Sequence, residues 1–180
     1  MAYFKTERLV LRPLQLKDAE RVEELAKDYD VAKTTLNIPH PYPAGGAKEY
    51  IQRVTEAEKN GEIVCLAITQ KENETFLGII NIKEDVKHHR GELGYWIGKP
   101  YWGQGYCTEA VKALIPFSFE ELKLNKLFAT AFTANQGSWK VMEKSGLKYE
   151  GTLKQHVHRS GRYFDLAYYG LIREDYLKER

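Results

Sequence analysis

Residues 92–110 read ELGYWIGKPYWGQGYCTEA, and this stretch decides the fold. Residues 92–98 predict a strand, and residues from Tyr106 to about 122 predict a long helix. The turn between them contains Gly103 and Gly105. At a helix start several backbone N–H groups lack a partner within the helix, and the helix dipole adds partial positive charge there. Because glycines leave these groups accessible, the turn is a candidate phosphate or pyrophosphate site.

Glycine-rich turns of three kinds bind phosphates at such a position. A P-loop requires the string GxxxxGK[ST], which this chain does not contain. A dinucleotide-binding turn requires GxGxxG and an acidic residue about 20 positions later. Here Thr108 replaces the third glycine, and residues 127–134 contain no Asp or Glu. The third kind is a loop that holds the pyrophosphate of coenzyme A. From the turn alone, this interpretation and a glycine turn that binds no ligand are equally supported.

The remaining sequence predicts one domain, with no linker, repeat or low-complexity segment to divide it. The predicted strands are 8–16, 62–70, 76–84, 92–98, 127–134 and two within 147–173 around Ser160-Gly161. The predicted helices begin at Asp18, span 47–60 and 106–122, and span 136–145 with a left-handed end at Gly146; residues 37–46 form a loop.

Three further expectations concern the central elements. Pro116 is expected to kink or loosen the long helix. The uncharged strand 127–134 is expected to be buried on both faces. Strands and helices alternate only around residues 92–145, so a parallel strand pair is expected there.

Composition excludes several classes of protein. The net charge of +2, without runs of like charge, does not suggest direct nucleic-acid binding. The N-terminus lacks the apolar core of a signal peptide, and no stretch approaches the roughly 20 apolar residues of a membrane span. The two cysteines, Cys65 and Cys107, belong to no metal-ligand spacing, and nothing requires a disulfide between them. We expect a cytoplasmic protein that binds neither metal nor membrane.

Four segments resemble the GNAT acetyltransferase superfamily, and most closely its RimJ/RimL-type ribosomal-protein N-acetyltransferase branch. They occur in the family's order along nearly the whole chain, as TERLVLR (6–12), GELGYWI (91–97), YWGQGYCTEA (101–110) and NQGS (135–138) with EKSGL (143–147). The resemblance implies a single domain over residues 1–180. Its expected fold is a mixed, mostly antiparallel sheet of about seven strands with a central splayed parallel pair, flanked by about four helices.

The resemblance also implies how acetyl-CoA, the expected co-substrate, is bound. The family loop is written Q/R-x-x-G-x-G/A; here Trp102 holds the Q/R position and Cys107 the last one, where we favour packing under the loop over phosphate contact. The pantetheine arm would pair with the free backbone of 95–97 in the splayed gap, where an N–H could hold the oxyanion. The implied cofactor-binding residues are Tyr95, Trp96, Ile97, Trp102, Gly103, Gln104, Gly105, Tyr106, Cys107, Thr108, Asn135 and Ser138.

Acetyl transfer to an amine also needs an acid and a base. Many GNAT enzymes use a tyrosine seven residues after the Asn, a position held here by Met142. The RimJ/RimL branch instead has a serine three residues after it, which makes Ser138 the candidate general acid. By local sequence alone, Asn135 and Ser138 fit ordinary helix-cap chemistry. Glu92 is the candidate base, acting directly or through a water molecule. An equal alternative is that Glu92 is only a solvent-exposed carboxylate at the end of a strand.

The acceptor is expected to be a primary amine, and by resemblance the N-terminal amine of a ribosomal protein. A polyamine, an amino acid or an antibiotic amine are alternatives, as is a non-catalytic acyl-CoA-binding module. Tyr29, Tyr42 and Tyr50 are equally candidates for the acceptor side and for the core. His156 and His158 share a strand face, but we favour surface or groove positions over a zinc site. Both monomer and homodimer remain open.

Overall fold

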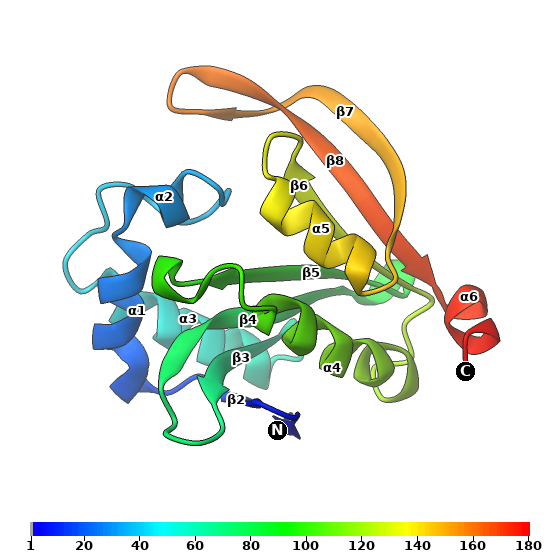
Figure 1. Ribbon diagram of the computed structural model, residues 1–180, viewed down its shortest axis with the longest axis horizontal. Coiled ribbons are helices and arrows are strands. Elements are labelled where there is room, and N and C mark those ends of the chain that lie inside the picture. The colour runs from blue at the N-terminus through cyan, green and yellow to red at the C-terminus, as the bar shows by residue number, and fades with distance from the viewer. Residues whose placement is uncertain (1) are drawn as a thin grey trace.

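A single sheet in the order β1-β2-β3-β4-β5-β6-β8-β7 runs through the protein in the computed structural model, which describes residues 2–180 (Figure 1). The strands are β1 (Phe4–Lys5), β2 (Leu9–Pro13), β3 (Ile63–Gln70), β4 (Phe76–Asp85), β5 (Arg90–Ile97), β6 (Lys126–Phe132), β7 (Lys148–Arg159) and β8 (Arg162–Ile172). The helices are α1 (Ala19–Ala26), α2 (Tyr29–Ala32), α3 (Gly46–Lys59), α4 (Tyr106–Glu120), α5 (Gln136–Lys144) and α6 (Arg173–Lys178), with 3₁₀ turns at Leu16–Asp18, Val86–His88 and Lys99–Tyr101.

The central strands β5 and β6 form the only parallel pair among the described residues, and they separate soon after they meet. Arg90, Gly91 and Glu92 pair with Lys126, Leu127 and Phe128. Beyond these positions, β5 pairs only with β4, and β6 only with β8. Figure 1 shows the two strands diverging from that junction. The expected splayed parallel pair is therefore confirmed.

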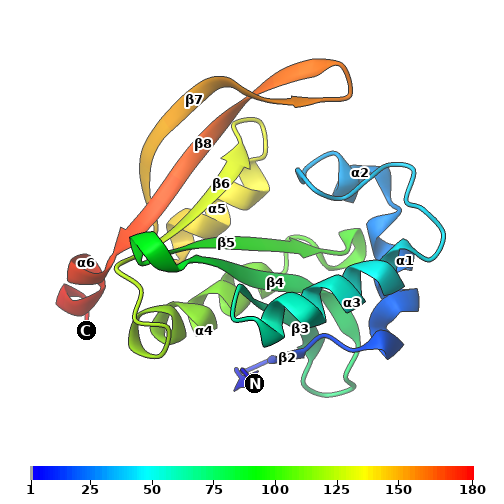
Figure 2. The same cartoon turned by 180° about the vertical axis from the view of Figure 1, so that it is seen from behind.

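Helices cover the two faces of the sheet unequally. The larger core includes Leu114 and Phe119 of α4, Met142 of α5 and apolar side chains from most strands. The smaller core joins α1 and α3 to β3 and β4. Figure 2, from behind, shows α3 across β3 and β4 while β6, β7 and β8 have no helix on that face.

This unequal cover corrects the prediction for strand 127–134. Leu127, Ala129 and Ala131 are buried in the larger core, but Phe128 and Thr130 on the other face are only half-buried. The absence of charge did not mean burial on both faces, because no helix lies over the second face of β6. The Phe128 ring instead stacks on Tyr168 of β8, with 6.2 Å between ring centroids.

The predicted elements are otherwise present, with shifts of a few residues at most ends. The first strand ends at Pro13 rather than 16, because residues Leu16–Asp18 turn into α1. In the described part of the chain the sheet has eight strands rather than about seven, and the α-helices number six rather than about four. The additions are short: β1 has 2 residues, α2 has 4 and α6 has 6, too few for a periodic pattern to identify. Helix α4 continues through Pro116, and Gly146 has the predicted left-handed conformation, with φ of 96°.

Candidate acetyl-donor and acceptor site

The glycine-rich turn presents a row of unpartnered amides at the start of α4. Gly103 and Gly105 have φ of 72° and 80°, a left-handed conformation that side chains with a Cβ rarely adopt. The first N–H of the helix to find a backbone partner is that of Glu109, which donates to the Gly105 carbonyl at 3.0 Å. Within residues 2–180, the N–H groups from Gly103 to Thr108 donate no hydrogen bond. This arrangement is suited to an anionic ligand.

Arg8 fixes this turn from the far end of the chain. Its Nη1 donates to the Gln104 carbonyl at 2.9 Å, its Nε pairs with Glu109 Oε2 at 2.7 Å, and its guanidinium lies 4.6 Å from the Tyr106 ring centroid. Partial burial favours the neutral acid, but hydrogen bonds from Thr6 and Arg8 prevail and lower the pKa of Glu109 below its ordinary value. Glu109 therefore stays ionised and occupied by Arg8, leaving the amides available to a ligand.

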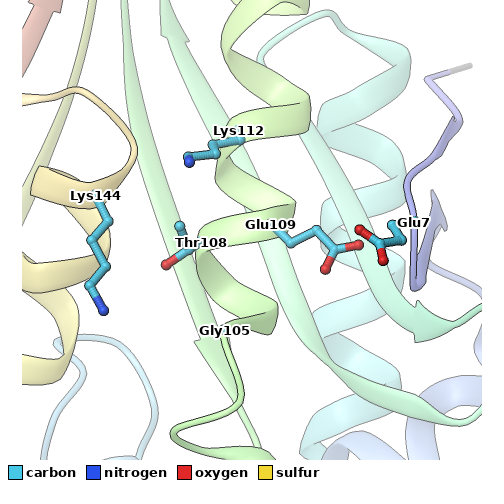
Figure 3. Close-up of a pocket in the computed structure, with 6 residues that line it drawn as sticks. All are labelled: Glu7, Gly105, Thr108, Glu109, Lys112 and Lys144. Atoms are coloured by element: carbon cyan, nitrogen blue, oxygen red, sulfur yellow. The ribbon is translucent and has the colours of Figure 1, made fainter.

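A cavity of about 340 Å³ opens beside these amides, lined by Glu7, Gly105, Thr108, Glu109, Lys112 and Lys144. Figure 3 shows the Lys112 side chain extending from α4 toward α5, which carries Lys144, with Thr108 on the same side of α4 as Lys112. Neither lysine forms an ion pair with any residue from 2 to 180. The cavity therefore has cationic groups near the helix start.

The splayed gap leaves the backbone groups of two β5 residues without a strand partner. Gly98 donates its N–H to the Leu77 carbonyl of β4. Because backbone groups alternate in direction along a strand, those of Trp96 also point toward β4. The backbone groups of Tyr95 and Ile97 therefore point into the gap. The expectation of free backbone at 95–97 is thus corrected for Trp96. The Trp102 indole Nε1 donates to the Ile97 carbonyl at 2.7 Å, which ties the turn to the end of β5.

Across the gap, Ser138 is held by two residues of the predicted site. Asn135 caps α5, and its side-chain oxygen accepts the Ser138 N–H at 3.2 Å. The Tyr95 hydroxyl donates to the Ser138 carbonyl at 2.8 Å and lies 3.1 Å from Ser138 Oγ. Burial, opposed by the Ser138 hydrogen bond, raises the pKa of the Tyr95 phenol, which therefore stays protonated. The cap geometry that the local sequence suggested is present, and the tyrosine adds a second support.

Glu92 lies on the opposite face of the sheet from Tyr95 and Ser138. The β4–β5 register is continuous, so Glu92 shares a face with Gly94 and Trp96, as the sequence predicted. Its side chain is exposed and makes no hydrogen bond or ion pair within the described chain. The structure therefore places the two candidate catalytic residues on opposite sides of β5 and does not bring them into contact.

Comparison with known proteins identifies this architecture. A sequence model described as "Acetyltransferase (GNAT) domain" matches residues 8–148. The chain is 31% identical to "Putative ribosomal N-acetyltransferase YdaF" of Bacillus subtilis (strain 168), over 97% of this chain and 96% of that protein. It belongs to the GNAT acetyltransferase family.

Solved structures agree in fold. A GNAT-family acetyltransferase from Bacillus anthracis superposes with a TM-score of 0.86 at 26% identity, covering 96% of this chain and 99% of that one. Mycobacterium smegmatis RimJ in complex with CoA-disulfide superposes with a TM-score of 0.83 at 19% identity, covering 93% and 83%. As a GNAT acetyltransferase, this chain is an N-acetyltransferase enzyme, which argues against a non-catalytic acyl-CoA-binding module.

Several other candidates have structural rather than site positions in this GNAT acetyltransferase. Cys107 packs against the larger core, and burial raises the pKa of its thiol to about 12, as expected for a packing role. Cys65 is buried and also a free thiol, 3.8 Å from the Tyr50 hydroxyl, which places Tyr50 in the smaller core. Tyr42 packs partly against that core.

The remaining candidates lie at the surface. Tyr29 is exposed and its ring lies 4.9 Å from that of His40. His156 and His158 are exposed beside Tyr168 and Tyr163 respectively. Between residues 2 and 180 no group of three or more His, Cys, Asp or Glu is placed to hold a metal. None of the helices in this part of the chain combines the length and the hydrophobicity of a transmembrane segment.

Sequence reasoning missed Arg8 and the Tyr95 side chain. The TERLVLR motif contains Arg8 but gives its side chain no role, and the resemblance implies a role only for the backbone of Tyr95. Thr6 and Arg8 both donate hydrogen bonds to the carboxylate of Glu109, which lies 101 residues after Arg8. No local sequence pattern indicates a contact over that separation. Only packing of β2 beside α4 reveals it.

Proposed function

We propose that this chain transfers the acetyl group of acetyl-CoA to the N-terminal α-amine of a protein. The unpartnered amides from Gly103 to Thr108 carry the donor part of this proposal, because they suit the pyrophosphate of coenzyme A. The Tyr95 backbone and the Ile97 N–H, which have no strand partner, suit an extended pantetheine arm, and an N–H there suits the developing oxyanion. Mycobacterium smegmatis RimJ, which shares this fold, is described as a complex with CoA-disulfide, and this supports coenzyme A as the ligand.

In this proposal each side of β5 performs one proton transfer. On the exposed side, Glu92 accepts a proton from the attacking amine through a water molecule. The amine nitrogen forms the new bond to the acetyl carbon as the carbon–sulfur bond breaks. On the other side, the Ser138 hydroxyl gives its proton to the departing thiolate, while Asn135 and Tyr95 hold the serine in place. Solvent then restores the Ser138 proton.

A terminal α-amine suits this arrangement better than a lysine. A terminal amine with a pKa near 7.8 is about a tenth neutral at pH 7, whereas a lysine near 10.4 is neutral to only a few parts in ten thousand. An exposed carboxylate such as Glu92, acting through a water molecule, is a sufficient base for the terminal amine. The name of the YdaF relative associates that protein with ribosomal acceptors, and this supports a ribosomal-protein terminus here.

The acceptor proposal is tested by thiol release from acetyl-CoA with peptides, polyamines, amino acids and aminoglycosides. We expect the highest kcat/KM with peptides whose terminal amine is free, and none with the same peptides blocked at that amine. Glu92→Gln should reduce kcat/KM for the best peptide at least tenfold. Faster turnover of a small amine than of every peptide, including ones from ribosomal protein termini, would refute the acceptor assignment.

Lys112 and Lys144 provide a separate test of the donor. Their position beside the α4 start suits the 3′-phosphate of coenzyme A, which follows the pyrophosphate in the molecule. The double variant Lys112→Ala/Lys144→Ala should raise KM for acetyl-CoA about fivefold, since exposed charge contacts are individually weak. With acetyl-dephospho-CoA, which lacks that phosphate, the variant and the parent should differ by less than twofold.

Lys87→Ala is the matched control, because Lys87 is exposed in a 3₁₀ turn and forms no ion pair with any described residue. It should leave both KM values unchanged. Equal losses with the two donors would show that the lysines do not recognise the 3′-phosphate.

A further inference from the structure

Residues 34–38, here called the strap, are held by the half of the molecule that lies across the gap. The strap follows α2, whose Val31 and Ala32 are buried and whose Asp30 pairs with Lys99 at 2.5 Å, just after β5. Its carbonyls, however, accept hydrogen bonds from the far half. Arg159 at the tip of β7 donates to the carbonyls of Thr35 and Ile38, the second at 3.0 Å. Asn135 Nδ2 donates to the Thr34 carbonyl at 3.2 Å.

The strap therefore bridges the open end of the splay. Strands β5 and β6 share hydrogen bonds only around Glu92 and Phe128, so little else in the sheet fixes their separation farther along. Figure 1 shows α2 at the end toward which the two strands diverge, with the tip of the β7–β8 hairpin leaning in its direction. Side chains that tie this segment to the hairpin tip and to α5 fix the width of that end.

Asn135 links the strap to the proposed acid. Its side-chain oxygen accepts the Ser138 N–H, and the nitrogen of the same amide donates to the strap. A side chain with an oxygen on one side and a donor on the other is required for both contacts at once. Movement of the strap is thereby coupled to the first turn of α5.

We propose that Arg159 and Asn135 are positioning residues that hold the strap across the acceptor end of the gap, so that the acceptor amine meets a preformed opening. This inference rests on the proposed function for its kinetic readout. Its physical basis is the planar guanidinium group of Arg159, whose two terminal nitrogens donate to two carbonyls at once. A lysine ammonium group does not have this geometry. In the proposed function acetyl-CoA lies against the start of α4 and the edge of β5, and no part of it is assigned to the two Arg159 contacts.

Arg159→Ala tests this with the best acceptor peptide. We expect KM for the peptide to rise about tenfold, the range expected when hydrogen bonds from a charged group are lost, while KM for acetyl-CoA stays within twofold. Asn135→Asp keeps an oxygen for the Ser138 N–H but removes the donor to Thr34, and should also raise the peptide KM. Arg162→Ala, an exposed arginine without an ionic partner in the described chain at the same hairpin tip, is the control and should change neither KM.

Hydrogen–deuterium exchange gives a readout that does not depend on activity. The amides of residues 34–38 should exchange faster in Arg159→Ala than in the parent protein or in Arg162→Ala. Unchanged exchange, or faster exchange with an unchanged or lowered peptide KM, would overturn the positioning role. A parent protein that turns over no amine would instead defeat the proposed function, and the exchange result would still show whether Arg159 holds the strap.

Discussion

Replacement of Ser138 with alanine should lower kcat about 100-fold and leave the dissociation constant for acetyl-CoA unchanged. General acid catalysis contributes on the order of 100-fold or more, and alanine removes the proton donor without adding volume. The contacts that position this residue involve its backbone: the Asn135 oxygen accepts its N–H and the Tyr95 hydroxyl donates to its carbonyl. Helix α5 should therefore start in the same place in the variant. Stopped-flow thiol release and calorimetric titration with acetyl-CoA measure the two quantities.

Ser145→Ala is the matched control, at the C-cap of the same helix. Its hydroxyl is buried and finds no hydrogen-bond partner among residues 2–180, so the substitution should leave kcat unchanged and be neutral or slightly stabilising. If Ser138→Ala retains kcat within a few-fold of the parent enzyme, the thiolate must leave without this proton donor. Tyr95, whose hydroxyl lies 3.1 Å from Ser138 Oγ, would then be the group to examine.

Gly105→Val should weaken acetyl-CoA binding at least tenfold. Gly105 has φ of 80°, and an L-residue in that region is destabilised by roughly 1–2 kcal/mol, more if it is β-branched. An added Cβ would also lie 3.4 Å from Arg8 Nη2, against the side chain that fixes the turn. Relief of this strain requires the backbone to rotate, which moves the amides that face the ligand. Calorimetric titration with coenzyme A reports the loss.

Gly61→Val separates strain from binding. Gly61 has φ of 71°, and a Cβ there would meet nothing within 4 Å, so the backbone strain is matched at a turn after α3. Both variants should show a similar fall in melting temperature, but only Gly105→Val should lose affinity. Unchanged affinity in a folded Gly105→Val protein would show that the turn does not hold the pyrophosphate.

Local sequence predicted most elements of this fold because periodicity, caps and turns act over a few residues. The helix start after Gly105, the left-handed Gly146 and the alternation that places Glu92 with Trp96 all follow from neighbours in the chain. The same reasoning failed for strand 127–134, since burial of Phe128 depends on whether a helix lies over that face. It also missed β1, α2 and α6, which are too short to show a period.

Some features of the candidate site could likewise be predicted from local sequence, and others depend on tertiary structure. The sequence by itself determined the glycine turn, the serine three residues after the Asn, and membership of an acetyltransferase-like pattern, because these depend on residue types at fixed spacing. Tertiary structure alone decided which groups meet: Arg8 with the turn, Tyr95 with Ser138, and Arg159 with a strap 124 positions away. Such contacts depend on how the strands are ordered and where β5 and β6 part, and that ordering is set by packing over the whole sheet rather than by any local pattern.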